Sequence, residues 1–112
     1  MEKILERSLL YDFYGELLSK HRRKIYESFV FEDLSLGEIA EAEGISRQAV
    51  HDSIKHTDKA LEEYESKLHL VERFLDVKSE VSEIRELASG KGDGEKRLET
   101  IGRLAEKILG EL

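Results

Sequence analysis

The sequence predicts an all-α fold, and three observations lead to that prediction. Apolar residues recur at steps of three and four along most of the chain, as they do on one face of a helix. The 112 residues include no proline, and 38% of them are charged. Such a composition favours long helices stabilised by surface ion pairs. We therefore expect a helical head, then a long helix and a C-terminal helix.

The head begins with two amphipathic helices. Residues 3–18 place apolar side chains at helical steps, from Ile4 to Leu18. Ser19 follows, and its hydroxyl is suited to accept a hydrogen bond from a free N–H in the first turn of a second helix. That helix is expected to bury Ile25 and Tyr26, and the pattern ends at Glu32-Asp33.

The segment Ser35–Lys55 has the spacing of a helix-turn-helix motif. Ser35 and Glu38 form the sequence pattern of a capping box, in which each side chain accepts from the backbone of the other. Gly44 suits the left-handed conformation that ends a helix, and Ser46 suits the cap of the next one. The second helix of such a motif projects its first turn outward, where it can enter a major groove.

The exposed side of this second helix is the candidate nucleic-acid-binding site. Gln48 can pair with adenine and Arg47 with guanine through two hydrogen bonds each. Arg47 and Lys55 are equally suited to phosphate, and Ser46 stands at a helix N-terminus that favours an anion. His51 lies on the same side. These five residues are the predicted contact surface.

A second basic patch precedes the motif. Lys20, Arg22, Arg23 and Lys24 are consecutive except for His21. The patch is either a second site for phosphate or the solvated start of a helix.

The overall charge opposes indiscriminate binding to polyanions. The formal net charge is −7, and residues 1–59 and 60–112 are both acidic, with 9 basic against 12 acidic and 9 against 13 side chains. Since phosphate binding depends on clustered Lys and Arg, any contact with nucleic acid must be local.

The helical pattern continues from Arg47 for about 40 residues without Gly or Pro. Either one helix runs to about Ser89, or two helices meet near 66–69. The apolar stripe from Leu61 to Ala88 is too long to bury against so small a head and needs a partner helix, in this chain or in another. The C-terminal helix can fold back on it or pair with a second subunit, and we expect a homodimer. The expected division is a helix-turn-helix domain at 1–58, a self-associating helical extension at 59–89, and a flexible turn with a C-terminal helix at 90–112.

Several classes of protein are not supported by the sequence. There is no cysteine, and no apolar segment has the length of a signal peptide or of a membrane span, so we expect a cytoplasmic protein. The four histidines lack partners at the spacing of metal ligands. We expect no metal, no cofactor and no enzymatic activity.

The chain resembles the YlxM family of small bacterial helix-turn-helix proteins, which are regarded as DNA-binding and related to region 4 of sigma-70. The resemblance covers roughly residues 5–88. It rests on Leu10-Tyr-Asp-Phe-Tyr14, Leu17-Leu18, Asp33-Leu-Ser-Leu-Gly-Glu-Ile-Ala-Glu41, Ser46-Arg-Gln-Ala-Val50, Asp52, Ile54-Lys55 and Leu61-Glu-Glu-Tyr-Glu-Ser-Lys-Leu-His-Leu70.

The resemblance implies two alternative functions. Family members are typically encoded beside genes of the signal recognition particle, which implies a DNA-binding regulator linked to that protein-targeting pathway. The alternative is an accessory of the particle that binds RNA or protein. Two features depart from the family: Ser19-Lys20 stands where Thr-Pro is expected, and residues 95–112 appear as an extension beyond its usual end.

Overall fold

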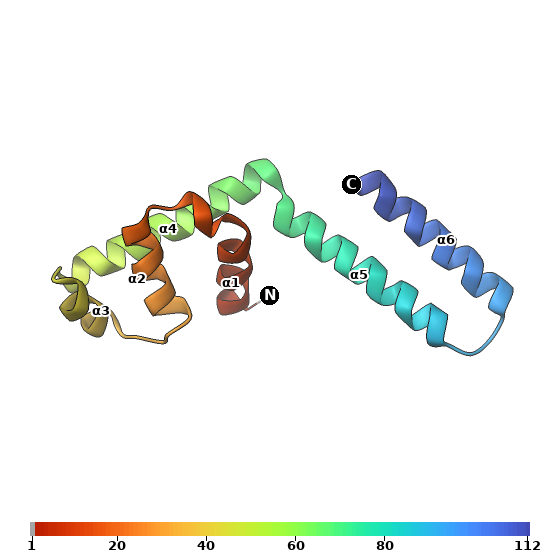
Figure 1. The fold of residues 1–112 in the computed structure, drawn as a ribbon, viewed down its shortest axis with the longest axis horizontal. Helices are drawn as coiled ribbons and strands as arrows, with labels where there is room; N and C mark the ends of the chain where they lie inside the picture. Colours follow the sequence, from red (N-terminus) through yellow and green to blue (C-terminus); the bar gives the residue numbers. More distant parts are fainter. Residues whose placement is uncertain (1) are drawn as a thin grey trace. The chain divides into compact units, whose positions relative to one another are not determined.

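A computed structural model describes residues 2–112, and in that part of the chain it contains helices and no strand (Figure 1), which confirms the all-α prediction. The elements are α1 (Lys3–Tyr14), a short 3-10 helix η1 (Gly15–Leu17), α2 (Lys20–Val30), α3 (Leu36–Glu43), α4 (Arg47–Leu68), α5 (Leu70–Ser89) and α6 (Gly94–Glu111). Among these helices, none is both long and apolar enough to cross a membrane.

The chain forms two compact units, one ending at Val71 and one spanning Glu72–Leu112. The division lies further along the chain than residue 58, where the sequence suggested a boundary, because the second half of α4 still belongs to the first unit. Leu61, in that half, is completely buried. The exposed part of the apolar stripe therefore starts later than Leu61.

In the first unit, α4 packs against α1, α2 and α3. Ile39, Val50 and Ile54, the apolar residues of the two motif helices, are at most 5% exposed. Burying an aliphatic side chain of this size contributes about 1.5–3 kcal/mol. The core is completed by Leu10, Tyr14, Ile25, Tyr26, Ala40 and Leu61.

The helical stretch after Arg47 is broken at His69. The prediction of two helices that meet near 66–69 is therefore confirmed, and the alternative of one helix to about Ser89 is wrong. His69 has a φ of 55°, in the left-handed region. The Tyr14 hydroxyl accepts from the Leu70 N–H (3.1 Å) and donates to the Glu65 carboxylate (2.5 Å). Glu65 also accepts from the Val71 N–H at 3.0 Å. A tyrosine of α1 thereby caps the start of α5.

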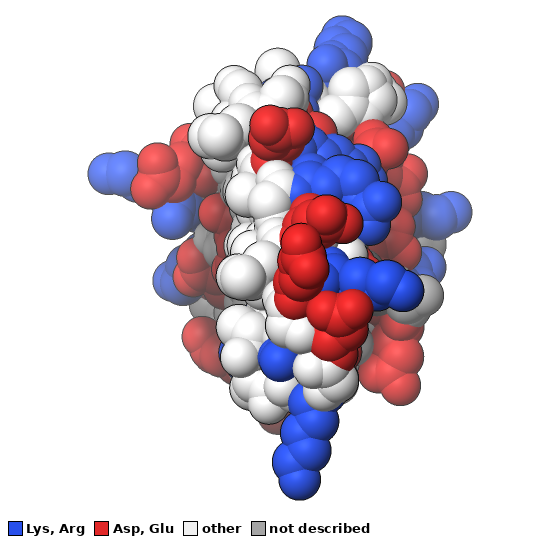
Figure 2. Space-filling view, turned by 90° about the vertical axis from the view of Figure 1, so that its right-hand side faces the viewer, with Lys and Arg blue, Asp and Glu red and all other residues white. Residues whose placement is uncertain are grey.

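The second unit is a hairpin of α5 and α6. Asp93 caps α6, and the Arg97 guanidinium donates to the carbonyl oxygens of Leu87 and Gly90 at the end of α5. Lys107 pairs with Glu80 at 2.9 Å. No residue of α6, which lies wholly in the described chain, is buried. Figure 2 shows one face of the molecule, on which a strip of residues other than Lys, Arg, Asp and Glu is bordered by charged side chains.

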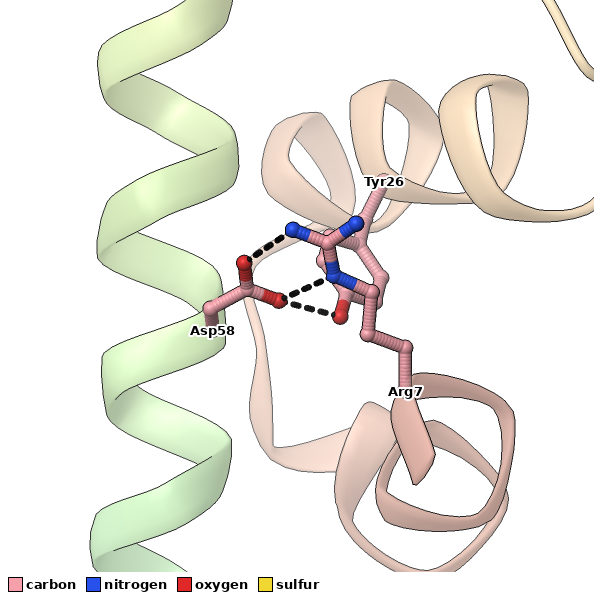
Figure 3. A network of polar contacts seen from close by, with 3 residues as sticks. All are labelled: Arg7, Tyr26 and Asp58. Carbon is pink, nitrogen blue, oxygen red and sulfur yellow. Dashed lines mark hydrogen bonds and ion pairs between the residues drawn. The ribbon is translucent and has the colours of Figure 1, made fainter. Parts of the chain in front are cut away.

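A polar network joins three helices of the first unit through Asp58 of α4 (Figure 3). Arg7 of α1 donates to both carboxylate oxygens, at 3.0 and 2.6 Å, and the Tyr26 hydroxyl of α2 donates at 2.6 Å. Tyr26 is completely buried. Burial and the bond to Asp58 raise the pKa of Tyr26, so its hydroxyl stays protonated and donates at neutral pH.

We expect Asp58→Ala to lower the free energy of unfolding by about 2–4 kcal/mol, because it leaves the buried Tyr26 hydroxyl and the Arg7 guanidinium without an acceptor. Chemical denaturation monitored by circular dichroism measures the change. Glu63→Ala is the control, since this residue is exposed on the same helix, and its effect should stay within about 0.5 kcal/mol. Equal values for the two variants would contradict a stabilising role for the network.

Candidate nucleic-acid interface

The first helix of the motif begins with the predicted capping box. The Ser35 hydroxyl accepts from the Glu38 N–H at 3.1 Å, and the Glu38 carboxylate accepts from the Ser35 N–H at 3.0 Å. The hydrogen bond from the Ser35 backbone lowers the pKa of Glu38, so the carboxylate is charged at neutral pH. These two bonds fix where α3 begins.

The turn between the two helices depends on Gly44. Its φ of 68° and ψ of 33° are left-handed, as predicted. The N–H groups of Gly44 and Ile45 both donate to the Ala40 carbonyl oxygen, which closes the end of α3. Ser46 then caps α4 by accepting from the Ala49 N–H at 3.0 Å. The spacing from one cap to the next sets the direction in which α4 leaves the turn.

All five residues of the predicted contact surface are exposed: Ser46, Arg47, Gln48, His51 and Lys55. Gln48, His51 and Lys55 lie on the side of α4 away from the buried Val50 and Ile54, whereas Ser46 is the N-cap of α4 and Arg47 opens its first turn. Arg47 extends back over α3, because a Cβ placed on Gly37 would lie 3.8 Å from its Nε. The guanidinium is therefore held beside the start of α3.

Asp52 belongs to the same surface, and the sequence analysis did not include it. Its carboxylate accepts from the Gln48 side-chain amide at 2.9 Å and lies 3.6 Å from Nδ1 of His51. Two of the residues suited to contact bases are thus engaged by a carboxylate of their own helix. The contact could have been predicted from the sequence, because residues four apart, such as Gln48 and Asp52, face each other on a helix.

Lys59 is a second residue that the sequence analysis missed. It follows His51 and Lys55 at steps of four, and all three line a hollow of about 400 Å³ between α4 and α1. Lys3 of α1 lines the same hollow, and so do the acidic residues Glu6, Asp58 and Glu62. The basic side of α4 thus continues past the motif, next to acidic side chains.

The second basic patch is dispersed in the structure. Lys20 is exposed, and Arg22 lines a separate hollow beside His56 of α4. Arg23 donates to the Tyr11 hydroxyl at 3.3 Å, and Lys24 pairs with an acidic residue of α3.

That partner of Lys24 is Glu43, at 3.3 Å. Glu43 occupies a position that is often apolar in this kind of motif, and its side chain is only 13% exposed. The ion pair with α2 explains how a carboxylate is accepted beside the turn. Within residues 2–112, no group of three or more His, Asp or Glu side chains is arranged to hold a metal ion.

Gly44→Ala should lower the free energy of unfolding by about 1–2 kcal/mol, because a Cβ is disfavoured at a left-handed φ. Nothing lies within 4 Å of the added carbon, so the cost is conformational rather than steric. Gly110→Ala is a matched control with equally open space in helical backbone, where alanine is neutral or stabilising by up to about 1 kcal/mol. Thermal denaturation of both variants gives the comparison, and a neutral Gly44→Ala would contradict the assignment of the turn.

The chain matches a known protein family over most of its length. Residues 1–101 match the UPF0122 family, described as "Putative helix-turn-helix protein, YlxM / p13 like". The match includes both helices of the motif and most of the C-terminal hairpin.

Individual members of this family are also similar to the chain over most of its length. A UPF0122 protein of Bacillus velezensis is 43% identical over 96 residues, covering 86% of this chain and 87% of the relative. The UPF0122 protein YlxM of Bacillus subtilis is 42% identical over 95 residues, covering 85% and 86%. A UPF0122 protein of Bacillus thuringiensis is 38% identical over 108 residues, covering 96% and 98%.

The last of these alignments corrects one expectation. It spans 108 residues and nearly the whole of both chains, so the segment 95–112 is for the most part shared with this relative. The family model itself ends at residue 101, within α6. The chain belongs to the UPF0122 (YlxM / p13-like) family of helix-turn-helix proteins.

Proposed function

We propose that this protein binds DNA through the contact surface of α4 and acts as a cytoplasmic, dimeric regulator. The observation that supports the proposal is the exposure of the first three turns of α4 directly after the Gly44 turn, on a helix whose opposite side is buried. This is the position from which a recognition helix enters the major groove.

The spacing along α4 divides the contact surface into two roles. Arg47 and Lys55 are eight residues apart, which is about 12 Å along a helix. That length is comparable to the width of the major groove, so both cations can reach phosphates at its edges. Gln48 and His51 lie between them, at the level of the bases.

Replacing both cations, in Arg47→Ala with Lys55→Ala, should weaken binding to duplex DNA by about 10- to 100-fold. The dependence of affinity on salt should also become shallower, by about two units of slope. Fluorescence anisotropy with a mixed-sequence duplex of about 30 base pairs, roughly three helical turns, measures both at several salt concentrations.

The control for this experiment is Lys91→Ala with Lys96→Ala, which removes the same number of charges from exposed positions near the hairpin turn. Its affinity should match that of the unmodified protein. If the α4 variant and the control bind equally well, the contact surface is not where DNA binds.

Asp52→Asn should strengthen DNA binding by about two- to fivefold. The substitution removes a negative charge from the side of α4 that approaches phosphate and removes the charge beside His51, while the Asn side-chain oxygen can still accept from the Gln48 amide. The same anisotropy measurement, with circular dichroism to confirm equal helix content, tests this. Weaker binding would instead show that Asp52 positions Gln48 for the base.

The second candidate is an accessory of the signal recognition particle that binds RNA or protein. The net charge of −7 and the exposed carboxylate of Asp52 within the motif favour it, because they oppose close approach to duplex DNA. Purified protein would then bind the RNA or the GTPase of the particle and show no measurable affinity for duplexes. If the protein binds duplex DNA and this binding depends on Arg47 and Lys55, the result supports the DNA-binding regulator over the accessory.

A further inference from the structure

The hairpin of the second unit lacks a core of its own. In α6, fully within the described chain, Leu98 is 70% exposed and Leu109 is 72% exposed, while Val81 of α5 is 50% exposed. The unit, Glu72–Leu112, is near the size of about 40 residues below which a chain usually needs association, a metal or disulfides to fold stably. The exposed apolar side chains are therefore expected to have a cover.

Exposed and half-buried apolar residues follow heptad spacing on α5, and the exposed apolar residues of α6 and its C-cap follow it with one glycine among them. The stripe of α6 steps by four and three, through Leu98, Gly102, Ala105, Leu109 and Leu112. The stripe of α5 steps by three and four, through Phe74, Val77, Val81, Ile84 and Ala88. Such spacing is typical of helices that pack with a partner helix, and small residues permit close approach.

Both stripes lie on the same side of the hairpin. The pairs Glu80–Lys107 and Leu87–Arg97 mark where α5 and α6 face each other. Counting 100° per residue, the α5 stripe is rotated by about 80–100° from Glu80 and Leu87, and the α6 stripe is rotated in the same sense by about 100° from Arg97 and about 180° from Lys107. On two antiparallel helices, rotations in the same sense carry both stripes toward one side of the hairpin.

The charges beside the two stripes have opposite signs. On α5, the exposed Lys78 and Arg85 each follow a stripe residue on the outer edge of the hairpin. On α6, the exposed Glu99 and Glu106 occupy the equivalent places. One edge of the apolar face is basic and the other is acidic, so the face is complementary to a copy of itself turned by 180°.

We propose that a second copy of this chain covers the hairpin, and that the two hairpins form a four-helix bundle about a two-fold axis parallel to the helices. This axis places α5 of each copy against α6 of the other, so that Lys78 and Arg85 face Glu106 and Glu99 of the second copy. A two-fold axis perpendicular to the helices would pair α5 with α5 and α6 with α6, and would set like charges against each other.

The register within one hairpin supports these pairs. Rotation about an axis parallel to the helices leaves each residue at its own height. Lys107 is level with Glu80 in one copy, and therefore the heights of Lys78 and of Glu106 in the other copy differ by no more than about one helical turn, 5.4 Å. The heights of Arg85 and Glu99 likewise differ by no more than about a turn. Both differences in height are within reach of a long basic side chain.

This arrangement has a consequence for the heads. Both hairpin turns lie at one end of the bundle, and both chains enter α5 at the other end. Two helix-turn-helix units are thus attached at the same end, as two half-sites on one duplex would require. The pairing deepens the dimeric part of the proposed function, and it does not depend on what the heads bind, so it can hold even if the proposed DNA binding fails.

Sedimentation at micromolar concentration should give twice the chain mass for the unmodified protein. Leu98→Lys with Leu109→Lys should raise the dissociation constant of the dimer by at least about 100-fold, because each copy loses two buried leucines. Lys96→Ala, on the charged side of α6, should remain dimeric. A monomeric unmodified protein would overturn the proposal and leave the apolar face to a different partner.

Charge reversal tests the orientation without altering the apolar face. Lys78→Glu with Arg85→Glu, and separately Glu99→Lys with Glu106→Lys, should each weaken the dimer by about tenfold or more. The chain with all four substitutions should regain the original affinity. Failure of this rescue, with helix content unchanged by circular dichroism, would overturn the α5–α6 pairing between copies.

A cysteine placed in the turn gives an independent measure of direction, since the chain has none of its own. With Lys91→Cys, a short bismaleimide should cross-link the two copies efficiently, because both turns lie at one end. In the opposite arrangement the turns are separated by about the length of a 20-residue helix, 30 Å. Absence of cross-linking in a sample that sediments as a dimer would overturn the parallel axis.

Discussion

The Asp58 carboxylate is the constraint on which the position of the candidate interface depends. It accepts from Arg7 of α1 and from Tyr26 of α2, and it stands on the helix that carries the contact surface. Apolar burial supplies most of the stability, but hydrophobic packing tolerates small rotations of a helix. A carboxylate with two fixed donors tolerates few, so the network selects one orientation of α4.

Features decided by neighbouring residues could be predicted from the sequence. The capping box of Ser35 and Glu38, the left-handed Gly44 and the cap at Ser46 each involve groups no more than a few residues apart. Local hydrogen bonds and the steric cost of a Cβ decide them, which is why the helix-turn-helix motif could be located. The helical period likewise identified the buried side of α4.

Features decided by distant residues could not be predicted in the same way. The break at His69 depends on Tyr14, 56 residues before the N–H that its hydroxyl binds. Arg23 is consecutive with other basic residues in the sequence, yet it donates to Tyr11 of another helix. The sequence identifies which residues are cationic. Whether each cation is free to bind phosphate depends on the carboxylates and hydroxyls that the fold brings next to it.

The acidic net charge is compatible with nucleic-acid binding if the first unit contacts the nucleic acid and the hairpin pairs with a second copy. The proposed contact surface is small, and a single copy with a net charge of −7 would hold a duplex weakly. Two surfaces joined through the hairpins would bind with an effective concentration set by the bundle, and their affinities would reinforce each other. In that arrangement the acidic side chains of α6 are not a penalty on binding, because they specify the partner hairpin. An acidic protein of this size can then discriminate a paired site from random duplex more sharply than a basic monomer could.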